Sequence, residues 1–209
     1  MQSIQSTSRA GHELDRLTTP SLVLRHFVPT DAPAVMHLNA EDTTRRWLPS
    51  HVYADLDQAR ATVAYLIASY RSPGDPRLGP YVLAIEARSS ELLLGHVGFS
   101  PLDVDVEVSY AIAEQARGRG YGAEALLAAC QWAAAAFGLR RIVALTASVN
   151  QSSRRTLDAA GFALTGSEVF HFQGVEQDVC RYVWGCEDRL NGSSRHSVEL
   201  PTRDRSRAS

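Results

Sequence analysis

Three alternating glycines and their neighbours form the part of this sequence best suited to chemistry. Gly118, Gly120 and Gly122 lie directly after a segment of alternating polarity and directly before a segment with helical spacing. A glycine has no Cβ, so its backbone adopts positive φ without strain and lets a ligand approach closely. Successive N–H groups in such a loop converge on an anion, and the N-terminus of the following helix adds about half a positive charge. The run therefore predicts a cradle for a phosphorylated ligand.

The spacing of these glycines separates the run from two common nucleotide loops. A P-loop requires a lysine after its last glycine, and the chain contains no lysine, so its 21 basic residues are all arginines. The dinucleotide fingerprint requires G-x-G-x-x-G, whereas here the glycines run G-x-G-x-G. The run from Arg117 to Gly122 instead resembles R/Q-x-x-G-x-G/A, the pyrophosphate-binding signature of the GNAT superfamily of acetyl-CoA-dependent N-acetyltransferases. The structural alternative is a strand-to-helix turn whose glycines serve only its tightness.

A second group of candidate residues lies further along the chain. The segment from Asn150 to Phe162 has a start rich in Ser and Asn and a closing Gly-Phe pair, and it resembles the N-x-x-S…G-F segment of the same superfamily. In that resemblance Asn150 holds the amides of the pantetheine arm, and Ser153 donates a hydrogen bond to the thiolate as it forms. The structural alternative is that Asn150 or Ser152 caps a short helix and Ser153 occupies its first turn.

The strand before the glycines carries the candidate base. An amine attacks a thioester only when it is unprotonated, and amine pKa values lie near ~8 for termini and ~10 for lysine-type amines, so the site needs a proton acceptor. Strand alternation places Glu107 on one face with Ser109 and Ala111. Glu107 precedes Arg119 by 12 residues, which matches the acidic position of the RimJ/RimL-type pattern E-x-x-Y…G-x-G. We expect it to act through one or two waters; the alternative is an ordinary exposed strand glutamate.

Binding of acetyl-CoA is predicted to depend largely on backbone groups. N–H groups around residues 110–112 bond the pantetheine arm and polarise the acetyl carbonyl, provided that this strand separates from the one predicted at 141–149. Arg117 and Arg119 supply positive field and backbone N–H groups, or are merely solvated. The predicted catalytic residues are Glu107 and Ser153. The predicted acetyl-CoA-binding residues are Tyr110, Ala111, Ile112, Arg117, Gly118, Arg119, Gly120, Tyr121, Gly122, Ala123 and Asn150. The reaction needs neither a metal nor a cysteine.

The elements around these residues follow a mixed order. Alternating or apolar runs predict strands at 21–27, 81–86, 92–99, 106–112, 141–149, 162–172 and 178–184. Helical spacing predicts helices from 30 or 31 to 38, from 56 to 70, from 122 to 137 and after Asn150. The strand, glycine loop, helix and strand form a βαβ unit with parallel strands.

The order of these elements across residues 21–184 resembles the GNAT fold. The resemblance implies an α/β fold with a mixed, mostly antiparallel sheet, helices on both faces and a central βαβ unit. The pieces Trp47-Leu48-Pro49 and Gly95-His96-Val97-Gly98 resemble in particular the RimJ/RimL-type branch, which acetylates protein N-termini and small amines.

Composition predicts one globular domain with two polar ends. Hydrophobic residues make up 44% of the 209 residues and charged residues 21%, as is usual for globular proteins. We expect residues 1–19 to be a flexible lead-in, residues 20–188 to form the acetyltransferase domain, and residues 189–209 to be a disordered tail. A net charge of −2 gives no basic field for nucleic acid, and no run resembles a signal peptide or a membrane span. These features predict a cytoplasmic, metal-free monomer or homodimer without nucleic-acid or membrane partners.

The resemblance implies an acetyl-CoA-dependent N-acetyltransferase that moves an acetyl group to a primary amine by direct attack in a ternary complex. The acceptor is a protein N-terminus or a small molecule such as an antibiotic or polyamine. Its pocket is expected from residues 41–70 and from the last hairpin, which carry no sharp motif. The alternative from another class is a non-catalytic acyl-CoA-binding sensor, and the presence of both Glu107 and Ser153 counts against it.

Overall fold

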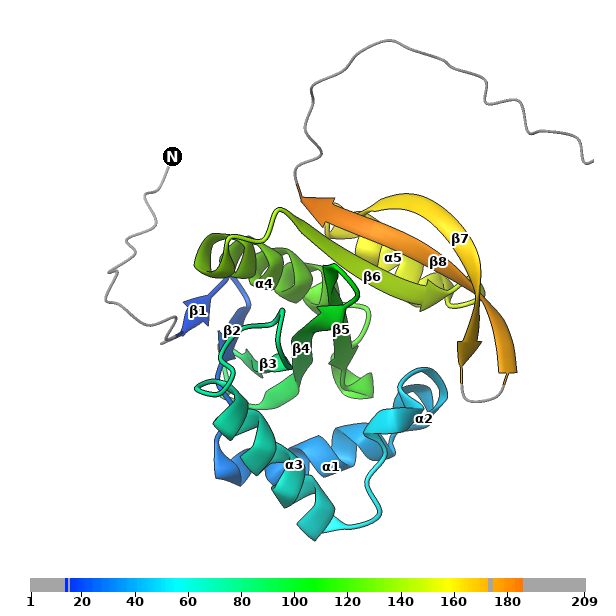
Figure 1. Ribbon diagram of the computed structural model, residues 1–209. Coiled ribbons are helices and arrows are strands. Elements are labelled where there is room, and N and C mark those ends of the chain that lie inside the picture. The colour runs from blue at the N-terminus through cyan, green and yellow to red at the C-terminus, as the bar shows by residue number, and fades with distance from the viewer. Residues whose placement is uncertain (1–13, 15, 173–174, 186–209) are drawn as a thin grey trace, which may run out of the picture.

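The part of the chain that the structure describes, residues 14, 16–172 and 175–185 of a computed structural model, folds around one sheet of eight strands (Figure 1). The order in the sheet is β1-β2-β3-β4-β5-β6-β8-β7. The strands are β1 (Leu17–Thr18), β2 (Leu22–Arg25), β3 (Tyr81–Ala87), β4 (Leu93–Leu102), β5 (Asp105–Ile112), β6 (Arg141–Ala147), β7 (Ala163–Phe172) and β8 (Val175–Gly185). The helices are α1 (Ala32–Ala40), α2 (Asp42–Trp47), α3 (Leu56–Ser69), α4 (Tyr121–Phe137) and α5 (Gln151–Ala159). Short 3-10 turns are η1 (Pro29–Asp31), η2 (Pro49–His51) and η3 (Glu114–Ala116).

Helices cover both faces of the sheet. On one face, the main core joins Leu126 of α4 and Leu157 of α5 to strand residues such as Ile142. On the other face, Val35 of α1 and Val63 of α3 pack in a second cluster. All strand pairs are antiparallel except β5 with β6, which are parallel and joined through α4. The predicted α/β fold, a mixed and mostly antiparallel sheet with a central βαβ unit, is therefore confirmed.

Helix α4 begins one residue before the predicted start at 122 and ends at residue 137, as predicted. Gly120 precedes its first residue with φ 81° and Gly138 follows its last with φ 66°, both in the left-handed region that favours glycine. The buried stripe of α4 is rich in small residues, and Cys130 is fully buried within it. Burial raises the pKa of the Cys130 thiol, so it remains protonated. Cys130 is therefore a core residue.

The folded region begins earlier than the boundary at residue 20. Leu14 is only 7% exposed and belongs to the main core, and Leu17–Thr18 form β1, paired with β2. The assignment of all of residues 1–19 to a lead-in is thus wrong for these residues, because two isolated leucines are too few to show a strand pattern. Residues 1–13, 15, 173–174 and 186–209, which include the predicted tail at 189–209, lie outside the described residues.

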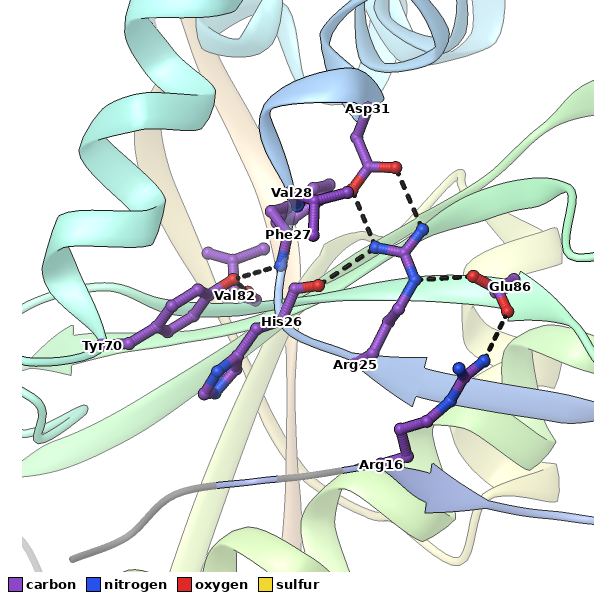
Figure 2. A network of polar contacts seen from close by, with 9 residues as sticks. All are labelled: Arg16, Arg25, His26, Phe27, Val28, Asp31, Tyr70, Val82 and Glu86. Atoms are coloured by element: carbon purple, nitrogen blue, oxygen red, sulfur yellow. Dashed lines mark hydrogen bonds and ion pairs between the residues drawn. The ribbon is translucent and has the colours of Figure 1, made fainter.

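The joint between β2 and α1 holds a buried network of charges (Figure 2). The Arg25 guanidinium donates to Asp31 through Nη1 and Nη2, at 2.8 and 3.0 Å, and to Glu86 through Nε at 2.6 Å. Asp31 precedes α1 as predicted, but its side chain makes no cap hydrogen bond to that helix. The carboxylate instead accepts from Arg25 and from the Val28 N–H at 2.9 Å. Asp31 therefore stabilises the turn that leads into α1, and it does not bond the first N–H groups of that helix.

Replacing Arg25 with Met should strongly destabilise the protein. The side chains of Arg25, Asp31 and Glu86 are 16%, 8% and 6% exposed, so the change leaves two buried carboxylates without their shared cation. Breaking a buried pair costs about 3–5 kcal/mol, which corresponds to a fall in melting temperature of roughly 10 °C in a domain of this size. Calorimetry would measure it.

The matched control is Arg60→Met, because its ion pair with Asp57 joins side chains that are 62% and 87% exposed. Exposed pairs of this kind contribute about 0–1 kcal/mol, so its melting temperature should stay near that of the wild type. Equal effects of the two substitutions would contradict the importance of the network.

Candidate active site

The two parallel strands separate soon after they meet, and a cleft of ≈ 1080 Å³ opens between them. Their ladder holds two residue pairs, Val106 with Ile142 and Glu107 with Val143. Both strands continue beyond it, β5 to residue 112 and β6 to residue 147. Figure 1 shows β6, β8 and β7 fanning away from β5. The separation that the sequence analysis required for a ligand beside β5 is therefore present.

The cleft collects nearly all of the candidate residues. Its lining includes both predicted catalytic residues, Glu107 and Ser153. It also includes ten of the eleven residues predicted to bind acetyl-CoA, namely Tyr110, Ala111, Ile112, Arg117, Gly118, Gly120, Tyr121, Gly122, Ala123 and Asn150. Arg119 is exposed and does not belong to the lining. Two motifs that are distant in sequence thus meet in one space, while the role of each residue stays a prediction.

The backbone of β5 presents hydrogen-bonding groups to this cleft. Hydrogen bonds in an antiparallel pair recur at every second residue, and the Ala113 N–H donates to the Leu94 carbonyl at 2.7 Å. Ala111 lies two residues before Ala113, so its backbone groups also point toward β4. The N–H groups of Tyr110 and Ile112 alternate with it and therefore point toward the opening. Of residues 110–112, these two are therefore the ones that can offer N–H groups to a ligand.

The three alternating glycines serve different purposes. Gly118 and Gly120 have φ of 75° and 81°, and a Cβ built on either would meet no protein atom within 4 Å. Gly122 has no positive φ, but a Cβ there would lie 3.0 Å from the Thr156 side chain. The first two shape an open concavity before the 17-residue helix α4, and the third allows α4 and α5 to approach. An anion at this helix N-terminus would be favoured by unsatisfied N–H groups and the helix dipole.

The start of α5 places Ser153 beside Tyr110. The Asn150 Oδ1 accepts from the Ser153 N–H at 3.1 Å, so the helix is capped by Asn150 rather than by Ser152. The Tyr110 hydroxyl donates to the Ser153 Oγ at 3.3 Å. Burial raises the pKa of Tyr110, which keeps its hydroxyl a donor at neutral pH. Since the Ser153 oxygen accepts here, its own hydrogen is available in another direction.

Glu107 lies half-buried in the cleft at the point where β5 and β6 part. Burial raises the pKa of its carboxyl group, and the positive charge of Arg181 on β8 partly opposes that shift. No hydrogen bond or ion pair joins this carboxylate to another described residue. A partly desolvated carboxylate with a raised pKa is a better proton acceptor than a solvated one.

The acceptor side was anticipated only as a region. The part of the lining that comes from α2, η2 and β8 lies within residues 41–70 and the last hairpin, from which the acceptor pocket is predicted. The side chains are Thr43, Arg46, Trp47, His51, Gln177 and Val179. They belong to no motif, and helix α2 is not among the helices predicted from the sequence. No signal in a single sequence would have selected them individually.

His51, which lines this side of the cleft, stacks on the buried His96. The rings of His51 and His96 lie 5.6 Å apart with an interplanar angle of 29°. His96 is buried in β4, and its Nε2 has no hydrogen-bond partner among the described residues. Burial, together with the neighbouring His51, lowers the pKa of His96 to about 3, and burial lowers that of His51 as well. At neutral pH both imidazoles are therefore uncharged, and His51 adds no positive charge to the lining of the cleft.

The described part of the chain shows neither a metal centre nor a membrane-spanning helix. There, no three or more His, Cys, Asp or Glu side chains come together in a way that could hold a metal ion. Likewise, none of the described helices is both long enough and apolar enough to cross a membrane.

Comparison with known proteins identifies relatives over most of this region. The family described as acetyltransferase (GNAT) domain matches residues 21–163. An uncharacterized N-acetyltransferase of Bacillus subtilis (strain 168), YoaA, is 28% identical over 153 residues, which cover 72% of this chain and 84% of the relative.

Solved structures share the fold at low sequence identity. RimL, a ribosomal L7/L12 alpha-N-protein acetyltransferase in complex with coenzyme A, superposes with a TM-score of 0.68 at 20% identity, covering 81% of this chain and 97% of its own. The microcin C7 self-immunity acetyltransferase MccE, in complex with acetyl-CoA and AMP, superposes with a TM-score of 0.67 at 16% identity, covering 80% and 94%.

The buried histidine predicts a measurable acid sensitivity. In the unfolded chain His96 takes up a proton near its ordinary pKa of ~6.5, whereas the folded protein resists protonation down to about pH 3. The unfolded state therefore binds more protons below pH 6.5, and stability falls as the pH is lowered. Between pH 7 and 5.5 this group should cost about 1 kcal/mol of unfolding free energy, and His96→Leu should remove that share in urea titrations.

The exposed His37 offers the matched control. His37→Leu should keep the pH dependence of the wild type over the same interval. If His96→Leu also kept it, His96 would have to be protonated in the folded protein at mildly acidic pH.

Proposed function

The chain belongs to the GNAT acetyltransferase family, and from this premise we propose that it is an acetyl-CoA-dependent N-acetyltransferase that acts on a primary amine by direct attack in a ternary complex. One observation carries the proposal. The opening between β5 and β6 brings an anion cradle, two outward-facing backbone N–H groups, Glu107 and Ser153 into one cleft.

The cleft fits the pieces of acetyl-CoA in order along β5. Gly118 and Gly120 leave a concavity that a Cβ would fill, and this suits a pyrophosphate at the start of α4. The N–H groups of Tyr110 and Ile112 then suit the amides of the pantetheine arm and the acetyl carbonyl oxygen. When bound, acetyl-CoA supplies an electrophilic thioester carbon. Donors fixed beforehand at the carbonyl oxygen favour the charge that develops there during attack.

Two side chains handle the protons of the transfer. The N–C bond to the amine forms as the C–S bond breaks, so the amine must lose a proton, and the sulfur leaves as a thiolate that takes its proton from solvent. Glu107 takes the amine proton, through one or two waters, and its raised pKa suits this task. Ser153 directs its hydroxyl hydrogen to the departing thiolate, since its oxygen already accepts from Tyr110.

The acceptor is an amine that carries one positive charge before it reacts. Of the described residues that line the cleft, Glu107 is the only acid, while Arg46 and Arg155 add positive charge. A polyamine would place several cations against these groups, so a protein N-terminus or a small monoamine fits better. The structural relatives include RimL, a ribosomal L7/L12 alpha-N-protein acetyltransferase, and MccE, a microcin C7 self-immunity acetyltransferase.

A mass-spectrometric screen of acetylated products tests this proposal. The protein would be incubated with acetyl-CoA and, separately, with peptides of varied N-terminal residue and with small amines. The proposal expects an acetylated product and an equal amount of released coenzyme A with at least one acceptor. Tight binding of acetyl-CoA without turnover on either panel would favour the non-catalytic acyl-CoA sensor instead.

Gly120→Val should abolish binding of acetyl-CoA. A β-branched residue resists φ near 81°, and its side chain would fill the concavity expected to hold the pyrophosphate. Isothermal titration calorimetry would measure the loss, with Gly166→Ala as a control, because a Cβ there meets no neighbour and the residue lies in β7. Unchanged affinity in a folded Gly120→Val protein would refute the cradle.

Glu107→Gln should slow turnover and leave the affinity for acetyl-CoA nearly intact. Gln keeps the size of Glu and loses its basicity, and loss of a general base costs ~10²–10⁴-fold. A base that acts through water should fall toward the lower end. The defect should shrink as pH rises, because more of the amine then arrives deprotonated.

The pH profile of kcat and KM separates this role from another. A raised KM for the acceptor at normal kcat would mean that Glu107 binds the ammonium rather than removing its proton. Full activity of the variant at all pH values would assign the base to another group.

A further inference from the structure

The residue between α1 and α2, Glu41, has a buried carboxylate that contacts the loop between β5 and α4. Glu41 has extended backbone angles between the two helices, and its carbonyl accepts the first backbone hydrogen bond of α2, from Arg45 at 2.9 Å. Its side chain is 9% exposed. The carboxylate accepts from the Glu114 N–H at 2.9 and 3.1 Å and from the Arg117 Nη2 at 2.6 Å. A single residue at the start of α2 therefore holds the loop that leads to the cradle.

The Arg117 guanidinium holds the other end of this contact. Its Nε donates to the Ile112 carbonyl at 2.8 Å, so one planar group joins the last residue of β5 to Glu41. Arg117 is also the first residue of the glycine signature, directly before Gly118. This side chain is thus neither merely solvated nor free to grip a phosphate. It fixes the carbonyl at the end of β5 and the loop from which the cradle begins.

The two ends of this clamp, defined as Glu41 and Arg117, belong to opposite parts of the cleft. The side chains of α2 line the acceptor side, through Thr43, Arg46 and Trp47, whereas Gly118 and Gly120 line the cradle. Because both members of the pair are largely buried, neither can be withdrawn without leaving the other charge desolvated. A movement of the cradle loop must therefore also move Glu41, directly before α2.

We propose that Glu41 and Arg117 are positioning residues that couple the acetyl-CoA site to the acceptor side of the cleft. The inference depends on the proposed function, since it assigns the two sites to donor and acceptor. A ligand bound in the cradle reduces the mobility of the loop before α4. Through the clamp, it also reduces the mobility of α2. Linkage makes the effect mutual, so an amine seated against α2 tightens the binding of acetyl-CoA by the same factor.

Glu41→Gln tests the coupling with acetyl-CoA as the probe. The amide oxygen of Gln still accepts from the Glu114 N–H, but the charge that holds Arg117 is gone. Calorimetry should show affinity for acetyl-CoA weakened by about tenfold, within the ~5–150-fold range usual for coupled sites. Hydrogen exchange adds a readout that a purely structural pair would not move. Saturating acetyl-CoA should slow the exchange of α2 amides in the wild type and leave them unchanged in Glu41→Gln, while the cradle amides are protected in both.

Two further variants complete the test. Glu114→Gln is the matched control, the same substitution at an exposed side chain of the same loop, and should behave like the wild type in both assays. If Glu41→Gln fails to fold, Arg117→Lys keeps the charge but cannot hold Glu41 and the Ile112 carbonyl together, and should show both effects more weakly.

Three results decide between the proposals. Wild-type affinity for acetyl-CoA in the folded clamp variants would overturn the coupling. So would slowed α2 exchange that persists in Glu41→Gln, because direct contact with the ligand would then explain it. A wild-type protein that does not bind acetyl-CoA would instead overturn the proposed function.

Discussion

The brevity of the parallel ladder between β5 and β6 is the constraint on which the site depends. Each strand is committed on its other side, β5 to an antiparallel ladder with β4 and β6 to one with β8. Within the sheet, the described ladder between the two halves consists of the pairs Val106–Ile142 and Glu107–Val143 alone. Beyond them, backbone groups of β5 face an open space, and unpaired backbone groups away from water are costly. The opening is therefore stable only with water or a polar ligand in it, which suits a binding site.

The surrounding contacts serve to keep this opening in one shape. In the first turn of α4, the Glu124 carboxylate accepts from the Thr19 hydroxyl at 2.6 Å and from the Ser21 N–H at 2.8 Å. This anchors the start of α4 to the β1–β2 turn. The clamp of Glu41 and Arg117 fixes the loop on the opposite side of the glycines. The cradle is thus held at both flanks while its own glycines contribute no packing.

The sequence could predict what is local and repeated, and it could not predict what depends on partners far along the chain. The bounds of α4 were predicted to within one residue, because the positive φ at the flanking Gly120 and Gly138 is a local demand, and Asn150 was among the predicted caps because capping is local as well. The strand at residue 17 was missed, since two residues that pair with β2 have no periodicity of their own. Glu41 was equally invisible, because its partners lie more than 70 residues away.

Residue-resolved hydrogen exchange of the β5 amides with and without acetyl-CoA tests the central claim most directly. If the opening binds the pantetheine arm and thioester, the Tyr110 and Ile112 amides should exchange readily in the free protein and become protected when acetyl-CoA binds. Ala111 should be protected in both states, because its phase directs it toward β4. Binding of acetyl-CoA that leaves the Tyr110 and Ile112 amides unprotected would contradict the assignment of this opening as the donor site.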